Sequence, residues 1–378
     1  MSVLGNTALR IDDEQTMLLE VSRNFCAEHG IEAARAHLET ELAYDATLWD
    51  DIVAMGWTGI GLPEEVGGAG LGIGAAVPVL ENMGRALLGT PLMSTLLAAQ
   101  LLHRAGGEEA ASYLEQIAAG SPACVADLES EDWQGETAAR INADKRLDGE
   151  KRLVMDAQSA ALFLVTIGSR SAPKLAVVTR DALVDAAIRP RQLIDHTHRA
   201  ADVVFDGVEP ALVLEGSSVA RALRDYRLLG ALLVAAESTG AAASCLDTVV
   251  DYLKTRKQFG KLIGSYQALK HPSVDILTAV DSARSFIYHA ATVVGDEALG
   301  RDQEIACRMA KAQATETLKH AGDRAVQFHG GMGFTWECDA QLFLRRAQWA
   351  QQQFGDAQAH RAQLAQLLFD DPDTASTA

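Results

Sequence analysis

The stretch Gln327-Phe328-His329-Gly330-Gly331-Met332-Gly333-Phe334 reads as the end of a helix that runs into a glycine turn. Glycines are poor residues for a helix interior, because each costs about 1 kcal/mol relative to alanine there. In a turn, however, they leave bare backbone N–H groups that an anionic ligand can approach closely. The stretch therefore indicates a ligand-binding turn rather than a continuing helix.

A second unusual run lies upstream, Arg256-Lys257-Gln258-Phe259-Gly260-Lys261, and leads into Tyr266-Gln267. Arg256 is either a solvated arginine that meets the helix dipole or a guanidinium that clamps a phosphate. Phe259 either packs in the core or faces an adenine or flavin ring. The amides of Gln267 and Gln327 suit the edge of a heteroaromatic ring. Together the two runs predict a protein that holds a diphosphate-bearing cofactor.

The overall charge limits the partners of the chain. Its 378 residues carry a formal net charge of -18, with Asp+Glu 51 against Lys+Arg 33. This balance argues against nucleic acid or an anionic membrane surface as the main partner. A small anionic ligand would need a local basic site. No Walker or Rossmann fingerprint is present, and no His/Cys/Asp/Glu set has metal-ligand spacing, so we expect no metal.

The cysteines and the N-terminus bear on the cellular compartment. An odd, dispersed set of cysteines is typical of reduced, buried thiols in a cytosolic protein, and here it comprises Cys26, Cys124, Cys245, Cys307 and Cys338. The first residues lack a basic region followed by an apolar one, so no secretory signal is predicted. The longest apolar run, 228–236, is shorter than the roughly 20 residues that span a bilayer. We expect a cytoplasmic protein with no membrane segment.

Three zones of different composition follow one another along the chain. The first, to about 120, has helical spacing, interrupted by the tight loop Leu62-Pro63-Glu64-Glu65-Val66-Gly67-Gly68-Ala69-Gly70. The second has short β-branched runs at 161–167, 175–179 and 201–205, and Asp148-Gly149 marks a hairpin turn. The third returns to long helical segments, at 217–257, 265–297, 302–326 and 354–369.

These zones predict an α+β fold of three domains. We expect an N-terminal α-helical domain at 1–120, a small antiparallel β-barrel or sandwich domain at 121–215, and a C-terminal four-helix bundle at 216–378. The order of the three domains and the sequence motifs together resemble the acyl-CoA dehydrogenase family of flavoproteins over essentially the whole length of the chain. The likeness rests on the Pro63–Gly68 loop, the Arg256–Gly260 run with Gln267, the Gln327–Gly333 run, and Arg345-Arg346.

The resemblance implies a dimer or, more typically, a tetramer with FAD across a subunit interface. Contacts to the adenosine diphosphate part of a flavin held mainly by the neighbouring chain would come from Arg256, Gln258, Phe259, Gln267, Gln327, Gly330 and Gly331. The implied reaction is α,β-desaturation of an acyl-CoA thioester. A carboxylate removes the α-proton, the β-hydride passes to the flavin, and electrons leave through an electron-transfer flavoprotein.

The chain departs from the family pattern at the catalytic base. The usual Glu follows the arginine run, and here that position is Gly355, within Phe354-Gly355-Asp356. Asp356 is displaced by one residue and is shorter, and it is the candidate base. Some members carry the base on the first bundle helix instead, but that position is Gly230. Glu237 lies about two turns further along and is not expected to reach.

A second departure concerns the strands that face the flavin ring. The family's first run becomes Val125-Ala126-Asp127-Leu128-Glu129-Ser130-Glu131-Asp132 here, and its second becomes Leu153-Val154-Met155-Asp156. Both lose hydroxyl donors that hold the ring of the chain's own flavin. The residues that would contact the FAD of a neighbouring chain are therefore present. Those that would hold the chain's own flavin ring, and the catalytic base, are replaced.

Three interpretations account for this pattern. The chain is one subunit of a heteromeric acyl-CoA dehydrogenase and lends FAD contacts to a partner that carries the Glu, as in bacterial enzymes that act on steroid side chains or other bulky thioesters. Alternatively, it is a self-sufficient homo-oligomeric dehydrogenase with Asp356 or another acid as base. In the third interpretation it is a flavin-free relative that scaffolds a complex or performs other CoA chemistry.

Overall fold

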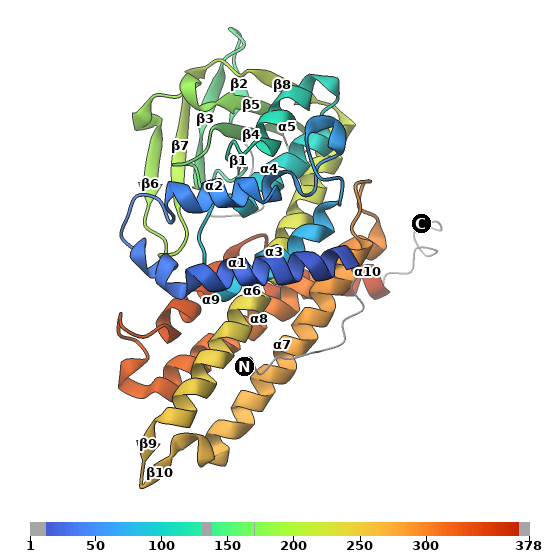
Figure 1. Ribbon diagram of the computed structural model, residues 1–378. Coiled ribbons are helices and arrows are strands. Elements are labelled where there is room, and N and C mark those ends of the chain that lie inside the picture. Colours follow the sequence, from blue (N-terminus) through green and yellow to red (C-terminus); the bar gives the residue numbers. More distant parts are fainter. Residues whose placement is uncertain (1–12, 131–137, 170, 370–378) are drawn as a thin grey trace.

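The computed structural model describes residues 13–130, 138–169 and 171–369. The strands between residues 123 and 215 lie in the upper part of the molecule beside short N-terminal helices, and long helices from both ends of the chain form the lower part, with a small two-stranded hairpin at its tip (Figure 1). This is the predicted order of a helical, a β and a second helical domain. Among the described residues one helix, α6 (Ser217–Thr255), is apolar enough to cross a bilayer, but 94% of its most apolar stretch is buried inside the fold. It is the central helix of the core.

The N-terminal domain contains five helices in its described part, α1 (Asp13–Ala36), α2 (Ala46–Ala54), α3 (Ala76–Arg85), α4 (Leu92–Ala105) and α5 (Ala111–Ala118). Asp45 begins α2, because its side chain accepts a hydrogen bond from the Leu48 N–H at 2.8 Å. The predicted tight loop forms around the short 3₁₀ turn η2 (Glu64–Val66). Gly68 is required there, since a Cβ would lie 2.1 Å from the Leu62 carbonyl oxygen.

The β domain consists of two four-stranded sheets, with strand orders β1-β4-β5-β8 and β2-β3-β7-β6. The strands are β1 (Ala123–Ala126), β2 (Arg140–Ile141), β3 (Leu147–Met155), β4 (Leu162–Ser169), β5 (Ala172–Thr179), β6 (Ile188–Arg191), β7 (Ala200–Val208) and β8 (Leu212–Glu215). Their inner faces enclose a compact apolar core that includes Phe163, Val165 and Phe205. Neighbouring strands are antiparallel except for β1, which runs parallel to β4. The sequence had predicted only antiparallel pairing.

The predicted hairpin at Asp148-Gly149 is wrong. Both residues lie inside β3, at a register shift opposite β7, and Gly149 has a φ of 156°. The chain turns instead just before β3, where Lys145 adopts a φ of 60° and donates its N–H to the Asn142 carbonyl. The Asp-Gly pair therefore forms a β-bulge, in which glycine is also favoured.

The C-terminal domain contains α6, α7 (Gln267–Val293), α8 (Arg301–His329), α9 (Ala340–Gln352) and α10 (Ala357–Phe369), together with the hairpin β9 (Lys257–Gln258) and β10 (Lys261–Leu262). The four predicted helices are α6, α7, α8 and α10. Helix α9 was not predicted, and it packs against α8 and α6. The helix α8 ends where Gly330 takes a φ of 61°, and the 3₁₀ turn η8 (Gly330–Met332) follows.

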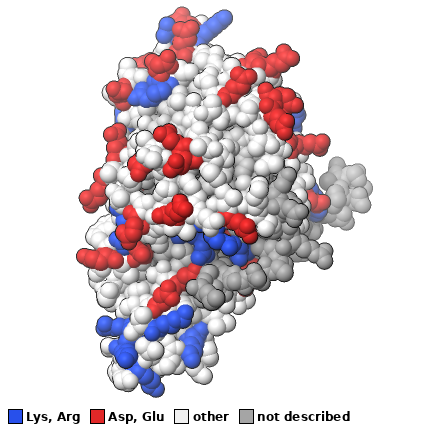
Figure 2. All heavy atoms as spheres, in the orientation of Figure 1, with Lys and Arg blue, Asp and Glu red and all other residues white. Residues whose placement is uncertain are grey.

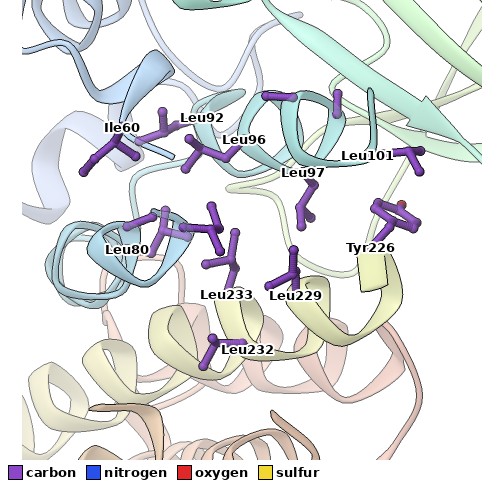
Figure 3. Packing of buried hydrophobic residues seen from close by; sticks show 14 of the residues in the cluster. Ile60, Leu80, Leu92, Leu96, Leu97, Leu101, Tyr226, Leu229, Leu232 and Leu233 are labelled. Atoms are coloured by element: carbon purple, nitrogen blue, oxygen red, sulfur yellow. The ribbon is translucent and has the colours of Figure 1, made fainter. Parts of the chain in front are cut away.

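Helices α3 and α6 cross at unusually close range. A Cβ on Gly84 of α3 would lie 2.0 Å from the Glu237 carbonyl oxygen, and one on Gly240 of α6 would lie 1.7 Å from the Glu81 carbonyl oxygen. The two glycines thus let the two backbones touch reciprocally. Beside this crossing, leucines of α3, α4 and α6 face one another in a continuous apolar layer (Figure 3). The crossing fixes the wall of the pocket described next.

Candidate active site and bundle end

A pocket lies where α3, α4 and α6 meet the β domain. It is partly open to solvent, and its cavity volume is about 100 Å³. Leucine, methionine and valine side chains form half of its lining. Polar groups enter it at a few points, among them Ser94, Asp127, Asp156, His198 and Glu237.

Neither of the two positions at which the base was sought carries a carboxylate. Gly355 has a φ of 93°, a conformation that strains any residue with a side chain. Gly230 on α6 lies directly under the ring of Phe354, and a Cβ on it would come within 2.4 Å of the Phe354 Cε1 atom. The phenylalanine ring therefore occupies the space over the second position.

Asp356, the candidate base, is exposed and caps α10. Its Oδ1 atom accepts a hydrogen bond from the Ala359 N–H at 2.7 Å, as expected of a helix N-cap. Among the described residues, the pocket lining near it consists of Gln353 and Phe354, not of Asp356 itself. This geometry gives Asp356 a structural role and supplies no contact between its carboxylate and the pocket.

Glu237 does reach the pocket, through the close crossing of α3 and α6. Its Oε1 atom lies 2.8 Å from Nη1 of the fully buried Arg346, whose Nε lies 2.5 Å from Oδ2 of Asp195. Burial alone would raise the pKa of Glu237, but Arg346 and His198 outweigh burial and hold it below its ordinary value. An ionised, paired Glu237 is thus a fixed part of the wall rather than a free base.

Asp156 is the pocket acid whose ionisation is least favoured. Burial raises its pKa to about 6, although the hydroxyl of Ser94 donates a hydrogen bond to its Oδ2 at 2.6 Å. Its backbone φ of 55° is rare for a residue other than glycine. The sequence offered a usable signal here, because Asp156 ends the altered second flavin-facing run.

A buried lysine holds the loop that contains Gly355. Lys311 of α8 donates hydrogen bonds from Nζ to the carbonyl oxygens of Ala350, at 3.1 Å, and of Gly355, at 2.8 Å. Burial lowers the pKa of Lys311 to about 7. The Nε2 atom of His360 lies 3.0 Å from the Phe354 carbonyl oxygen and fixes the loop from its other side. Sequence reasoning missed both residues, because each lies inside an ordinary helical pattern.

The lowered pKa of Lys311 predicts a pH-dependent stability. The unfolded chain keeps this lysine protonated up to about pH 10.4, so between its two pKa values the unfolded state binds more protons. The free energy of unfolding should therefore gain up to about 1.4 kcal/mol per pH unit from this residue as the pH rises from 7 to 9. Urea denaturation of the wild type and of Lys311→Met at pH 7, 8 and 9 measures the difference. Equal pH slopes in the two proteins would contradict the assignment.

The residues predicted to contact a cofactor lie together at the far end of the bundle. Arg256, Gln258 and Phe259 are exposed on the β9–β10 hairpin, and Gln267 begins α7. Gln327, Gly330 and Gly331 are exposed at the end of α8. The two segments are joined by the ring of Tyr252, which stacks on that of His329 with centroids 4.3 Å apart.

This end is basic although the chain as a whole is acidic. Lysine and arginine gather at the tip that carries β9 and β10, whereas the visible face above it is dominated by acidic residues (Figure 2). The exposed cations include Lys254, Arg256, Lys257 and Lys261. Among the described residues no ion-pair partner faces the Arg256 guanidinium, and nothing lies within 4 Å of a Cβ built on Gly330 or Gly331. These groups fit the pyrophosphate and adenosine part of FAD.

The fit to a flavin ring inside the chain's own pocket is poorer. The N–H of Arg152 donates to the Leu128 carbonyl at 2.7 Å, and that of Leu153 donates to Oδ1 of Asp202 at 3.1 Å. Backbone donors beside the pocket are therefore already engaged. Of the first altered run, Glu131 and Asp132 lie outside the described residues. Among the described residues, the hydroxyl side chains that line the pocket are Thr90, Ser94 and Tyr226, and none of them lies in the two altered strand runs.

Two family models match the chain. The one described as Acyl-CoA dehydrogenase, N-terminal domain, matches residues 12–121, and the one described as Acyl-CoA dehydrogenase, C-terminal domain, matches residues 228–369. The acyl-CoA dehydrogenase IpdE2 of Mycolicibacterium smegmatis is 32% identical over 95% of this chain and 100% of its own length.

Two solved structures extend the comparison. The Tcur3481-Tcur3483 steroid ACAD, solved as a single-residue variant, is 28% identical, with a TM-score of 0.82 over 97% of this chain and 99% of that chain. The ChsE4-ChsE5 complex from Mycobacterium tuberculosis shares the fold, with 23% identity and a TM-score of 0.83 over 96% of this chain and 99% of that chain.

Proposed function

The chain belongs to the acyl-CoA dehydrogenase family of FAD-dependent enzymes, and from this premise we propose that it is one subunit of a heteromeric acyl-CoA dehydrogenase. In this role its basic bundle end contacts the adenosine diphosphate part of an FAD that a partner subunit holds. The partner supplies the Glu that removes the α-proton of the acyl-CoA thioester. When bound, FAD accepts the hydride from the β-carbon, and an electron-transfer flavoprotein takes up the electrons.

One observation carries this proposal, namely the state of the two base positions. Gly355 has no side chain, and the ring of Phe354 fills the space over Gly230. A dehydrogenase that abstracted the proton from either of these two positions would need a carboxylate there. In contrast, the arginine and the glycines that are predicted to contact FAD at the bundle end are all present and exposed. A subunit that contacts FAD but does not remove the α-proton of the substrate accounts for both observations.

The comparisons support the same assembly. The Tcur3481-Tcur3483 steroid ACAD is named for two chains, and it is similar to this chain over nearly its whole length. From this likeness we infer that the enzyme is a tetramer built from two kinds of subunit, and that its substrate is a bulky, steroid-like acyl-CoA thioester.

The test is flavin content. Expressed alone, the chain should be purified colourless, and it should gain flavin absorbance only when it is co-expressed with a catalytic dehydrogenase subunit encoded beside it. The absorbance of that complex should bleach when acyl-CoA is added under anaerobic conditions. A yellow protein that is purified alone and bleached by acyl-CoA would overturn the proposal. A complex that stays colourless would favour a flavin-free scaffolding role.

Asp356→Asn tests the alternative in which this chain provides the base. Asparagine keeps the N-cap of α10 but removes the carboxylate, so the fold should be unaffected. We expect the turnover number of the assembled enzyme to be unchanged, as measured by reduction of an artificial electron acceptor. A loss of several orders of magnitude in kcat, with an unchanged melting temperature, would identify Asp356 as the base.

The self-sufficient alternative has one further observation in its favour. Asp156 lines the pocket, is buried, and has a pKa raised to about 6, which is suited to general-base catalysis. Asp156→Asn can still accept the hydrogen bond of Ser94. Under the subunit proposal this variant keeps the turnover of the complex, whereas under the alternative it abolishes turnover.

A further inference from the structure

Four buried polar side chains on the wall of the pocket are incompletely hydrogen-bonded. Thr90, His198, Glu237 and Trp349 all line it, and their exposed fractions are 4%, 6%, 3% and 5%. Within the residues that the structure describes, Thr90 Oγ1, His198 Nδ1, Glu237 Oε2 and Trp349 Nε1 have no hydrogen-bond partner. Each such atom costs roughly 1–3 kcal/mol in a folded protein. Fourteen such atoms occur among the described residues, and five of them, both ring nitrogens of His198 included, belong to these four side chains. Native proteins contain on the order of a few of them per 100 residues, so it is their concentration at one pocket that indicates partners supplied by the pocket's occupant.

The four side chains come from separate segments, and contacts connect three of them, His198, Glu237 and Trp349. Thr90 lies between α3 and α4, His198 precedes β7, Glu237 is on α6 and Trp349 is on α9. The ring of His198 lies against that of Trp349, with centroids 4.0 Å apart and planes tilted by 31°, and its Nε2 lies 3.4 Å from Oε1 of Glu237. Arg346 then anchors Glu237. The unpaired atoms of His198, Glu237 and Trp349 are thus held in place by these contacts.

The chemistry of these atoms selects one functional group. The indole N–H of Trp349 only donates, and an ionised Glu237 only accepts. A carboxylate on the ligand would be repelled by Glu237, and a carbonyl could accept but not donate. A hydroxyl both donates and accepts, so it alone among these groups can complement either kind of atom. The remaining lining is largely apolar, with Leu80, Met83 and Met93 among it, and suits a hydrocarbon body.

The geometry points to a binding site for hydroxylated acyl groups in this chain's own pocket, with Thr90, His198, Glu237 and Trp349 as the residues that determine specificity. This inference goes beyond the subunit role, because the pocket walls belong to this chain whichever subunit supplies the base. The ligand class is an acyl-CoA thioester whose apolar acyl part bears a hydroxyl remote from the thioester.

The test compares ligands that differ only by one hydroxyl. Isothermal titration calorimetry would measure the Kd of ω-hydroxyacyl-CoA thioesters, from hexanoyl to dodecanoyl, beside the unsubstituted acyl-CoA of each length, on the purified protein and on the assembled enzyme. At the chain length that fits, the hydroxylated ligand should bind about fivefold more tightly or better. Equal or weaker binding of the hydroxylated ligand at every length would overturn the assignment.

Two substitutions separate a binding role from a structural one. Thr90→Val and Trp349→Phe remove one unpaired polar atom each and keep most of the side-chain volume. Both should bring the ratio of the two affinities, hydroxylated against unsubstituted ligand, close to one, and both should raise the melting temperature of the ligand-free protein. The last effect follows because an uncompensated buried polar atom is removed.

Matched controls are available elsewhere in the chain. Thr58 is also buried, but its hydroxyl donates to the Ala118 carbonyl at 2.9 Å, and the Trp49 Nε1 donates to the Gly120 carbonyl at 3.0 Å. Thr58→Val and Trp49→Phe should therefore lower the melting temperature and leave the ligand preference intact. If the Thr90 and Trp349 variants behaved like these controls, the pocket's polar atoms would be structural and the inference would fail. None of these outcomes depends on which subunit holds the flavin.

Discussion

In the assembled enzyme, Arg256→Ala should weaken FAD binding by roughly 10- to 100-fold, because charge-assisted hydrogen bonds of this kind contribute about 1.5–3 kcal/mol. The guanidinium is exposed beside the open glycine turn, and no described residue neutralises it. The expected loss concerns the adenosine diphosphate end of FAD. It is measured as the flavin retained per complex during dialysis, and as the Kd for FAD added back to the apo complex.

Two further variants separate a specific clamp from a general charge effect. Lys254→Ala removes one exposed cation from the same basic tip, and it should have only a small, salt-dependent effect. Arg256→Lys keeps the charge but loses the planar fork, so its effect should be intermediate. If Arg256→Ala retained full flavin occupancy while the complex stayed assembled, the arginine would be a structural residue.

The largest loss of stability is expected from Gly240→Ala. The new Cβ would lie 1.7 Å from the Glu81 carbonyl oxygen, far closer than such atoms approach in real structures, so α3 and α6 must move apart. We expect the free energy of unfolding to fall by roughly 3 kcal/mol or more, since overpacking a rigid helix contact exceeds the cost of an ordinary core substitution. Chemical denaturation followed by circular dichroism measures this change.

Gly295→Ala provides the control, because nothing lies within 4 Å of a Cβ built there. Its free energy of unfolding should change by no more than about 0.5 kcal/mol. A similarly small change for Gly240→Ala would mean that the α3–α6 contact is loose in solution. Because Gly84 rests on the Glu237 carbonyl at the same crossing, we also expect Gly240→Ala to disturb the pocket wall that carries Glu237.

Much of the fold could be predicted from local sequence. The periodicity of apolar residues predicts the long helices of the bundle and the central strands, and the glycine turn at Gly330 marks the end of α8. Helix α9 was not predicted, although it has 13 residues like α10, because it directly follows a glycine-rich, aromatic stretch. The Asp148-Gly149 pair was misread because a hairpin turn and a β-bulge both favour glycine, and only the pairing with β7 distinguishes them.

The site was predictable only where it consists of contiguous residues. The cofactor contacts at the bundle end lie in two short runs, which the structure brings to the same end of the molecule. The pocket wall, in contrast, combines single residues from distant segments. Glu237 was expected to lie out of reach, because helical spacing says nothing of how closely α3 approaches α6. Gly84 and Gly240 were the available signal, as were the two histidines that follow Asp195.

The placement of charge along the molecule has a consequence for how subunits meet. An acidic body with a cationic tip behaves as an electric dipole; in Figure 2 the charged residues at the lower tip are mostly blue, whereas red residues outnumber the blue ones interspersed over the rest of the visible face. A second protomer approaching through solution would be rotated by that field before contact, with the tip of one molecule drawn toward the acidic flank of the other. Added salt should slow this encounter more than it accelerates dissociation, so ionic strength during purification will govern how readily subunits combine.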